Sequence, residues 1–143
     1  MITGMYAALA ALMIVALARN VISLRRQHKV ALGDGGHQDL LAAIRAHANA
    51  VEYLPIGLLL LLLLELSQGP AWLIHLLGSL FIIGRLIHAN GVSKAIIGRL
   101  IHANGVSKAI ITRRIIGMQF TIWLLIIMAV LNLLAFVGIQ LPG

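Results

Sequence analysis

The sequence contains no cysteine, and charged and aromatic residues are scarce. Without cysteine the chain has no disulfide framework, no thiolate metal site and no sulfur nucleophile, so thiol chemistry would need the thiol of a ligand. Charged residues make up only 10% of the 143 residues, whereas 61% are hydrophobic, and the mean hydropathy is +1.02. A soluble domain of this size would not stay in solution with that composition, so lipid is the expected solvent.

Four long apolar segments fill most of the chain. A helix that crosses the hydrocarbon core needs about 20 mostly apolar residues. The segments expected to cross are 2–24, 40–66, 71–90 and 115–141. These lengths predict an all-α, integral membrane four-helix bundle that forms a single domain over residues 1–143 and leaves no room for a soluble domain.

The basic residues lie on one side of this expected bundle. All eleven flank the first or the third connection: Arg19, Arg25, Arg26, Lys29, Arg45, Arg85, Lys94, Arg99, Lys108, Arg113 and Arg114. By the positive-inside tendency, loops 25–39 and 91–114 are expected in the cytoplasm and both termini outside. No aromatic residues are interleaved with these cations, so the net charge of +7 does not indicate nucleic-acid binding.

A 14-residue segment occurs twice without a difference, at 83–96 and at 97–110. Drift would not leave an old structural repeat identical, and two copies are too few for a solenoid, so a recent or engineered tandem duplication is favoured. If the second copy took the membrane register, the third span would shift by about 21 Å and carry Arg85, His88 and Lys94 towards the far side. The first copy is therefore expected to keep the register, with the second as a helical extension or interfacial segment at the cytoplasmic surface.

Polar residues interrupt the second span with helical spacing. Arg45, Asn49 and Glu52 lie at i, i+4 and i+7, so their directions on a helix agree to within about 60°. A charge at mid-bilayer costs about 2.5–3.5 kcal/mol on insertion scales, so Glu52 needs a partner or a ligand. Glu52 could instead pair with an arginine inside the bundle while Arg45 reaches the headgroups, but an ion pair alone does not need the asparagine between them.

Further polar residues are expected at the same cytoplasmic level. Arg85 and His88 lie one turn apart on the third span, and Arg113 and Arg114 precede the fourth. Each alone is typical of a helix end or an interhelical hydrogen bond. Together with Arg45, Asn49 and Glu52, which form a polar stripe on the second span, they suit a small zwitterionic or anionic ligand. The arginines would bind its carboxylates and the glutamate its amine. The histidines lack metal-ligand spacing, so no metal site is expected.

The pattern Arg45-x3-Asn49-x2-Glu52-Tyr53 with a downstream proline, followed by Gly84-Arg85-x2-His88, resembles the MAPEG family, membrane-associated proteins in eicosanoid and glutathione metabolism. The likeness is greatest to its small bacterial members. It implies a homotrimer in a bacterial inner membrane. It also implies that glutathione binds as co-substrate between neighbouring subunits, and that its sulfur is transferred to a lipophilic electrophile or hydroperoxide from the lipid bilayer.

The resemblance also implies roles for individual residues. Glutathione contacts are implied for Arg45, Asn49, Glu52, Tyr53, Arg85 and His88. The family's thiolate-stabilising arginine at the start of the fourth span corresponds to Arg113 or Arg114, and the spacing does not choose between them. Val92, four residues after His88, stands where the better-known eukaryotic members carry a tyrosine.

Two other interpretations stay open. A small proton-coupled multidrug exporter would use Glu52 as its proton and cation site, although the surrounding arginines would repel a cationic drug. The chain could also be an inactive membrane bundle made to study the effect of the duplication on folding. Enzyme activity therefore rests on the family resemblance and on the convergence of polar residues at one depth.

Overall fold

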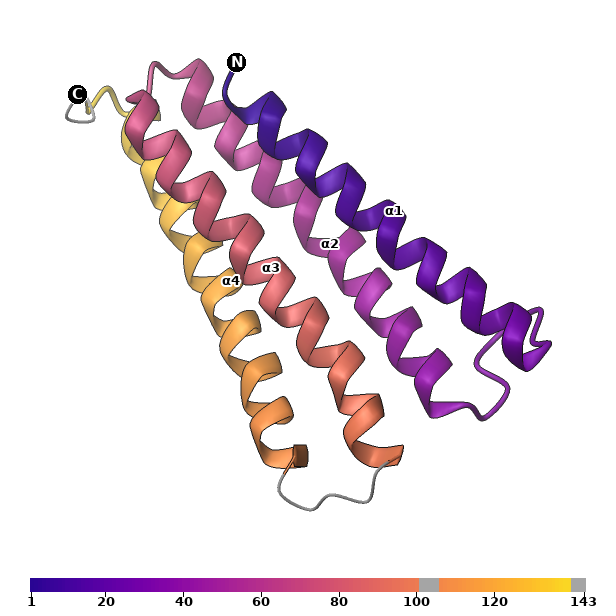
Figure 1. Ribbon diagram of the computed structural model, residues 1–143. Helices are drawn as coiled ribbons and strands as arrows, with labels where there is room; N and C mark the ends of the chain where they lie inside the picture. The colour runs from indigo at the N-terminus through magenta and orange to yellow at the C-terminus, as the bar shows by residue number, and fades with distance from the viewer. Residues whose placement is uncertain (101–105, 140–143) are drawn as a thin grey trace.

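The computed structural model describes the backbone of residues 1–100 and 106–139, and the side chains of residues 1–89 and 115–139. Within these ranges the chain forms four helices, α1 (Thr3–His28), α2 (Gln38–Leu66), α3 (Ala71–Leu100) and α4 (Val106–Phe136). They run up and down, so that both termini lie at one end of the bundle and the α1–α2 and α3–α4 connections at the other (Figure 1).

Each helix contains a segment that is long and apolar enough to cross a membrane. These segments are Thr3–His28, Gln38–Leu66, Ala71–Ala89 and Ile115–Phe136. The chain is thus an all-helical four-helix membrane bundle, and its polypeptide consists almost entirely of the spans and their connections.

The helices differ from the expected spans at their ends. α1 continues to His28 rather than ending at 24, and α4 ends at Phe136 rather than near 141. α3 passes the expected end at 90 and continues to Leu100, while α4 begins at Val106 rather than at 115. The 30 residues of α3 span roughly 45 Å, against a hydrocarbon core of about 30 Å, so the extra turns project beyond the membrane.

The second copy of the repeat is divided between two helices. Its first residues, 97–100, complete α3, and its last residues, 106–110, begin α4, while 101–105 lie outside the described residues. The expectation of a helical extension at this end therefore applies to both arms of the α3–α4 hairpin. The extension does not continue α3 through the whole copy, because the chain must turn back before α4.

The core of the bundle receives side chains from every helix. Tyr6, Leu54, Phe81 and Met128 are among its buried members. At Gly57 an added Cβ would lie 2.1 Å from the Cζ of Phe81, so the glycine lets the phenylalanine ring pack directly on the backbone of α2. Small residues at such contacts are how membrane helices approach closely, since lipid-facing surfaces gain nothing by hydrophobic burial.

Many large apolar side chains face outwards. Exposed examples from each helix are Leu12, Leu59, Trp72, Leu76, Trp123 and Ile126. Surfaces of this kind are normal where the surroundings are lipid tails or another subunit.

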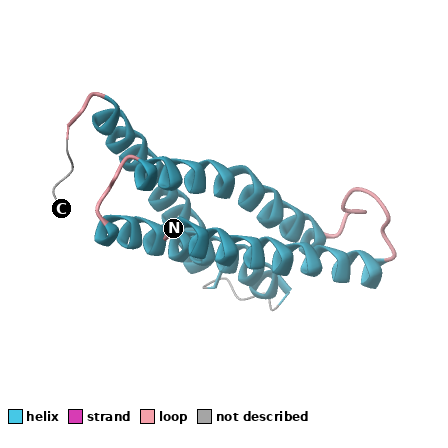
Figure 2. Cartoon of the chain, turned by 90° about the horizontal axis from the view of Figure 1, so that it is seen from above, coloured by secondary structure: helices cyan, strands magenta, loops and turns pink. Residues whose placement is uncertain are grey.

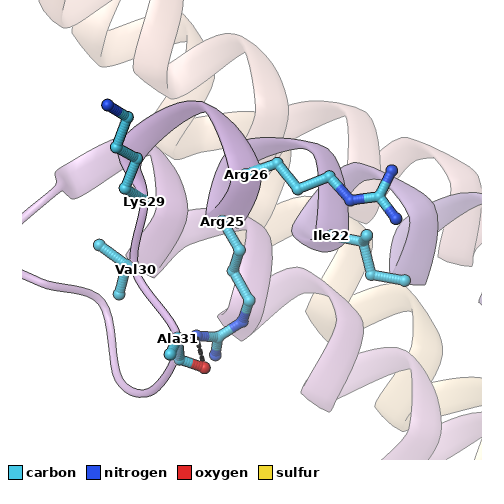
Figure 3. A pocket seen from close by; sticks show the side chains of 6 residues that line it. All are labelled: Ile22, Arg25, Arg26, Lys29, Val30 and Ala31. Carbon is cyan, nitrogen blue, oxygen red and sulfur yellow. Dashed lines mark hydrogen bonds between the residues drawn. The ribbon is translucent and has the colours of Figure 1, made fainter.

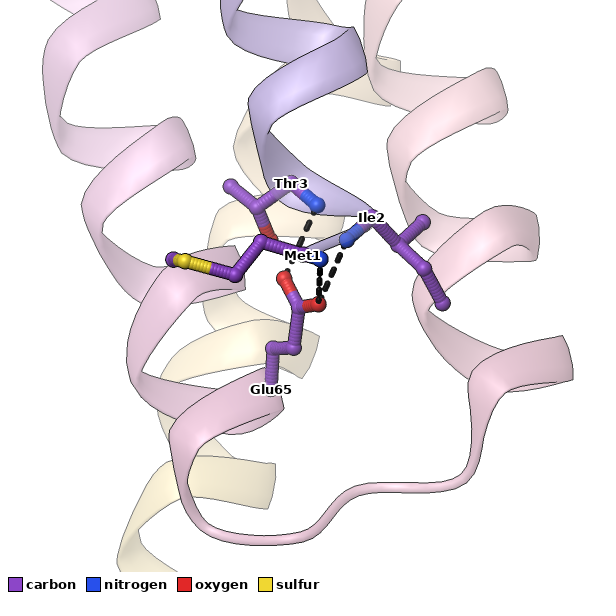
Figure 4. Close-up of polar contacts among 4 residues, drawn as sticks. All are labelled: Met1, Ile2, Thr3 and Glu65. Atoms are coloured by element: carbon purple, nitrogen blue, oxygen red, sulfur yellow. Dashed lines mark hydrogen bonds and ion pairs between the residues drawn. The ribbon is translucent and has the colours of Figure 1, made fainter.

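Glu65, near the end of α2, binds the start of α1, where the two chain termini lie. Its Oε1 accepts a hydrogen bond from the backbone N–H of Ile2 at 2.5 Å and its Oε2 one from that of Thr3 at 2.8 Å (Figure 4). The amine of Met1 lies 3.9 Å from the same carboxylate. No side chain of the N-cap residue Ile2 caps α1, so Glu65 supplies the negative group that the first N–H donors need.

A second polar contact joins α1 to α3 nearby. The hydroxyl of Tyr6 donates to the backbone carbonyl of His75 at 3.0 Å, and it lies 3.0 Å from His75 Nδ1 and 2.9 Å from Ser79 Oγ. The buried Tyr6 ring thus brings its polar atom to partners on α3, as buried tyrosines usually do.

Candidate functional site

Arg85 lies near the middle of α3 and is the centre of the polar site expected from the sequence. Its side chain is fully buried, with a relative exposure of 0%. Its Nη2 donates a hydrogen bond to Asn49 Oδ1 at 2.5 Å, and its Cζ lies 5.4 Å from the centroid of the Tyr53 ring, within cation–π range. Asn49 and Tyr53 are four residues apart on α2, so they share one face of that helix. The two halves of the sequence pattern, one on α2 and one on α3, therefore meet at this guanidinium.

The guanidinium of Arg85 is held in place but not satisfied. Its Nε and Nη1 are buried and have no hydrogen-bond partner among the described residues. Arginine is always charged and carries five N–H donors, and leaving buried donors of a charged group unpaired costs more than the roughly 1–3 kcal/mol of a neutral one. Such an arrangement favours the binding of a group with anionic oxygens.

Two members of the polar set on α2, Arg45 and Glu52, lie on the surface of the chain, whereas Asn49 is half-buried. Glu52 is the central residue of α2, and no described side chain forms an ion pair with it. The alternative in which Glu52 pairs with an arginine inside the bundle is therefore not seen in the described part of the chain.

His88 lies one turn beyond Arg85, where α3 packs closely against α4. Its side chain is buried, with a relative exposure of 7%. An added Cβ at Gly117 would lie 3.0 Å from the backbone N of His88, so α4 passes very near α3 at this level. Arg113 and Arg114 precede Gly117 by four and three residues on α4, and their side chains lie outside the described residues.

A basic cavity lies elsewhere, beside the end of α1. Its volume is about 360 Å³, and it is lined by Ile22, Arg25, Arg26, Lys29, Val30 and Ala31 (Figure 3). Arg25 Nη1 donates to the carbonyl oxygen of Ala31 at 3.2 Å, which ties the arginine to the loop. None of the site residues expected from the sequence lines this cavity. Its cations lie where the positive-inside tendency places them, at the expected cytoplasmic surface.

The MAPEG family model matches residues 3–96 of the chain. The chain belongs to the MAPEG family. The match contains the whole set on α2 and α3, namely Arg45, Asn49, Glu52, Tyr53, Arg85 and His88. It ends with the last residue of the first repeat copy, so the second copy and α4 lie beyond it. Arg113 and Arg114 therefore remain a prediction from the sequence resemblance.

The chain is also similar to a bacterial inner membrane protein. It is 43% identical to the inner membrane protein YecN of Escherichia coli K12 over 91 residues, which cover 64% of this chain and 70% of YecN. The same protein of Escherichia coli O6:H1 shows the same identity and coverage. The expected resemblance to small bacterial MAPEG members is thus confirmed.

The sequence analysis missed two polar clusters of this MAPEG protein. Glu65 contacts residues that are 63 and 62 positions away in the sequence, so no local pattern predicts these contacts. The one signal in the sequence was that Glu65 is acidic and lies far from every basic residue. His28, His37 and Asp39 also lie together at the α1–α2 connection. Their irregular spacing concealed this cluster, because a turn, and not a helix or strand period, brings them together.

Proposed function

We propose that this MAPEG protein binds glutathione at Arg85 and conjugates its sulfur to a lipophilic electrophile taken from the bilayer. The observation that supports the proposal most strongly is the buried guanidinium of Arg85, with Nε and Nη1 unpartnered among the described residues. Glutathione has two carboxylates, and the planar fork of an arginine matches carboxylate oxygens better than any other side chain. Asn49 and Tyr53 hold this guanidinium in one orientation before the ligand arrives.

The exposed residues of the α2 stripe support a site shared between subunits. Arg45 and Glu52 face away from their own chain, and a charge left against lipid at mid-bilayer costs about 2.5–3.5 kcal/mol on insertion scales. A homotrimer, in which a neighbouring subunit covers this face, removes that cost. The ligand then lies between subunits, where Glu52 accepts from its ammonium group and Arg45 pairs with a carboxylate.

The proposed chemistry needs a thiolate. A thiol is mostly protonated at neutral pH, and a nearby guanidinium in a partly desolvated site favours the thiolate, which is the nucleophile. Arginine stays protonated and cannot serve as the base, so Arg113 or Arg114 acts by electrostatic stabilisation while the thiol proton passes to water. With an aryl halide, the sulfur–carbon bond forms, the carbon–halogen bond breaks, and halide leaves with the bonding electrons.

The proposed location is the bacterial inner membrane, the location named for YecN. The α1–α2 and α3–α4 connections, which carry the basic residues, are placed in the cytoplasm by the positive-inside tendency. Glutathione then reaches Arg85 from the cytoplasmic side, and the electrophile comes laterally from the lipid.

The test combines binding, turnover and assembly on detergent-solubilised protein. We expect saturable glutathione binding in a titration, conjugation of a generic aryl halide, and trimers on chemical crosslinking. Absence of glutathione binding would overturn the proposed ligand, and crosslinked products no larger than a monomer would overturn the shared site.

A proton-coupled exporter is the second candidate, because Glu52 lies exposed at the middle of α2 without an ion pair among the described residues. An intramembrane carboxylate of this kind can carry a proton or a cationic drug. Proton-driven flux of a cationic dye in reconstituted vesicles, lost in Glu52→Gln, would favour it. Glutathione binding without such flux would favour the transferase.

A further inference from the structure

Three metal-ligating side chains lie together at the α1–α2 connection, which projects beyond the helices it joins (Figure 2). His28 ends α1, His37 is the N-cap residue of α2, and Asp39 lies in the first turn of α2. His28 Nε2 is 2.7 Å from Asp39 Oδ2. The rings of His28 and His37 stack with centroids 3.9 Å apart and 15° between their planes. One ligand atom from each residue lies within 4.8 Å of the other two, and all three residues are half-buried.

The backbone of the connection holds these residues in place. Lys29, the C-cap residue that follows α1, has the left-handed conformation, and the N–H of Val30 donates to the carbonyl of Arg25 at 3.0 Å. The N–H of His37 donates to the carbonyl of Asp34 at 2.9 Å, which closes a turn directly before α2. Gly35 has a φ of +57°, and an added Cβ would lie 2.6 Å from Val30 Cγ2, so this turn strongly favours glycine. The three side chains are thus brought together by local structure that depends on neither a ligand nor a second subunit.

We propose that His28, His37 and Asp39 form a binding site for a divalent transition metal such as Zn²⁺. Two imidazole nitrogens and one carboxylate oxygen are a donor set that zinc accepts, whereas magnesium and calcium prefer oxygen ligands alone. Tetrahedral bonds of about 2.0–2.2 Å place ligand atoms roughly 3.3 Å apart. His28 Nε2 and Asp39 Oδ2 must therefore separate by roughly half an ångström. The His37 ligand atom must approach the other two by up to roughly 1.5 Å, and one of the two stacked imidazole rings must turn so that both nitrogens point at the ion.

The three side chains leave a fourth coordination position for water or an anion. The bound ion joins the end of α1 to the start of α2 and stabilises this hairpin at the membrane surface. This proposal runs against the expectation from sequence that the histidines do not bind metal. It goes beyond the proposed transferase, because the cluster contains none of the residues assigned to glutathione.

The test is a zinc titration of the tag-free, detergent-solubilised protein by calorimetry in the absence of glutathione, whose thiol would itself bind the metal. We expect about one Zn²⁺ per chain, a rise in the thermal unfolding temperature on zinc addition, and Co²⁺ absorption bands typical of tetrahedral coordination. Asp39→Asn and His37→Ala should each weaken zinc binding by at least about tenfold. His47→Ala should leave it unchanged, since His47 is a half-buried histidine of α2 outside the cluster.

Each result decides for or against the site. Stoichiometric binding that is lost in His37→Ala and Asp39→Asn but retained in His47→Ala supports it. No zinc binding, or equal binding by the wild type and both cluster variants, overturns it. If His37→Ala proves unfolded by circular dichroism, Asp39→Asn decides alone, because asparagine keeps the oxygen that accepts from the N–H of Leu40. Glutathione titration is a separate measurement, so failure of the metal site leaves the proposed transferase untouched.

Discussion

Glu65 lies near the end of α2 and Arg85 near the middle of α3, and the two charged groups have different partners. Glu65 accepts hydrogen bonds from two backbone N–H groups, and the amine of Met1 lies nearby. Arg85 is more deeply buried, yet its guanidinium donates a hydrogen bond to Asn49 and has two nitrogens without a partner among the described residues. A charge whose partners come from its own chain can serve stability alone. A buried charge with open donors is stabilised best by a ligand that binds there, so Glu65 and Arg85 predict opposite mutational effects.

The largest effect is expected for Arg85→Ala combined with His88→Ala. Loss of charge-assisted bonds worth roughly 1.5–3 kcal/mol each should weaken glutathione binding by about a hundredfold or more, measured by titration. The matched control is Arg99→Ala with His102→Ala, which changes the same two residues in an identical sequence context. That pair should leave the affinity unchanged. The reverse pattern would show that the second copy forms the site.

Substitution of Arg113 and Arg114 together by alanine tests the arginines to which the family resemblance assigns thiolate stabilisation. Because stabilisation of a thiolate matters most for the reactive form, kcat/KM for aryl halide conjugation should fall about a hundredfold, while glutathione affinity falls less than about tenfold. Steady-state kinetics and titration on the same preparation give both numbers. Equal losses would mean that these arginines only hold the ligand.

Arg45→Ala and Glu52→Gln examine the outward face of α2. Each removes one charge available to a carboxylate or ammonium of the ligand, so the dissociation constant for glutathione should rise about tenfold to a hundredfold. Unchanged affinity in both variants would return these residues to a purely structural role. Crosslinking of the same variants shows whether a loss arises from failed trimer assembly.

The smallest effect is expected for Glu65→Gln, which makes the same substitution as Glu52→Gln at a residue outside the proposed site. The amide keeps an acceptor oxygen but loses the charge that two N–H groups and an amine share, so the free energy of unfolding should fall by about 1–2 kcal/mol. Glutathione affinity should not change, since Glu65 lies 16 residues, roughly 24 Å along α2, from Asn49. Thermal unfolding in detergent measures the first effect and titration the second. A loss of glutathione affinity with unchanged stability would contradict the assignment of Glu65 to stability and Arg85 to ligand binding.

The sequence alone determined the membrane class, the number of spans and the family. Runs of apolar residues long enough to cross a bilayer have no other stable setting, and polar residues that must be buried stand out against them. The expectation that the first repeat copy keeps the membrane register stays a prediction, which the hydrogen bond between Arg85 and Asn49 supports. That argument needed only the cost of moving charges into hydrocarbon.

Tertiary structure decided which members of the polar set meet. Arg45, Asn49 and Glu52 lie within about 60° of one another around α2. Helical periodicity does not predict which of them the neighbouring helix contacts. The position of α3 places Asn49 and Tyr53 against Arg85 and leaves Arg45 and Glu52 outside.

Tertiary structure also decided how the duplication is accommodated. Two identical copies have identical local propensities, so the sequence offers no signal for where the helix should end in the second one. α3 ends at Leu100 and α4 begins at Val106 because the hairpin must return to pack α4 against α3. The same physical reason applies to His28, His37 and Asp39, since it is the closure of a turn, rather than helical or strand spacing, that brings the three side chains together.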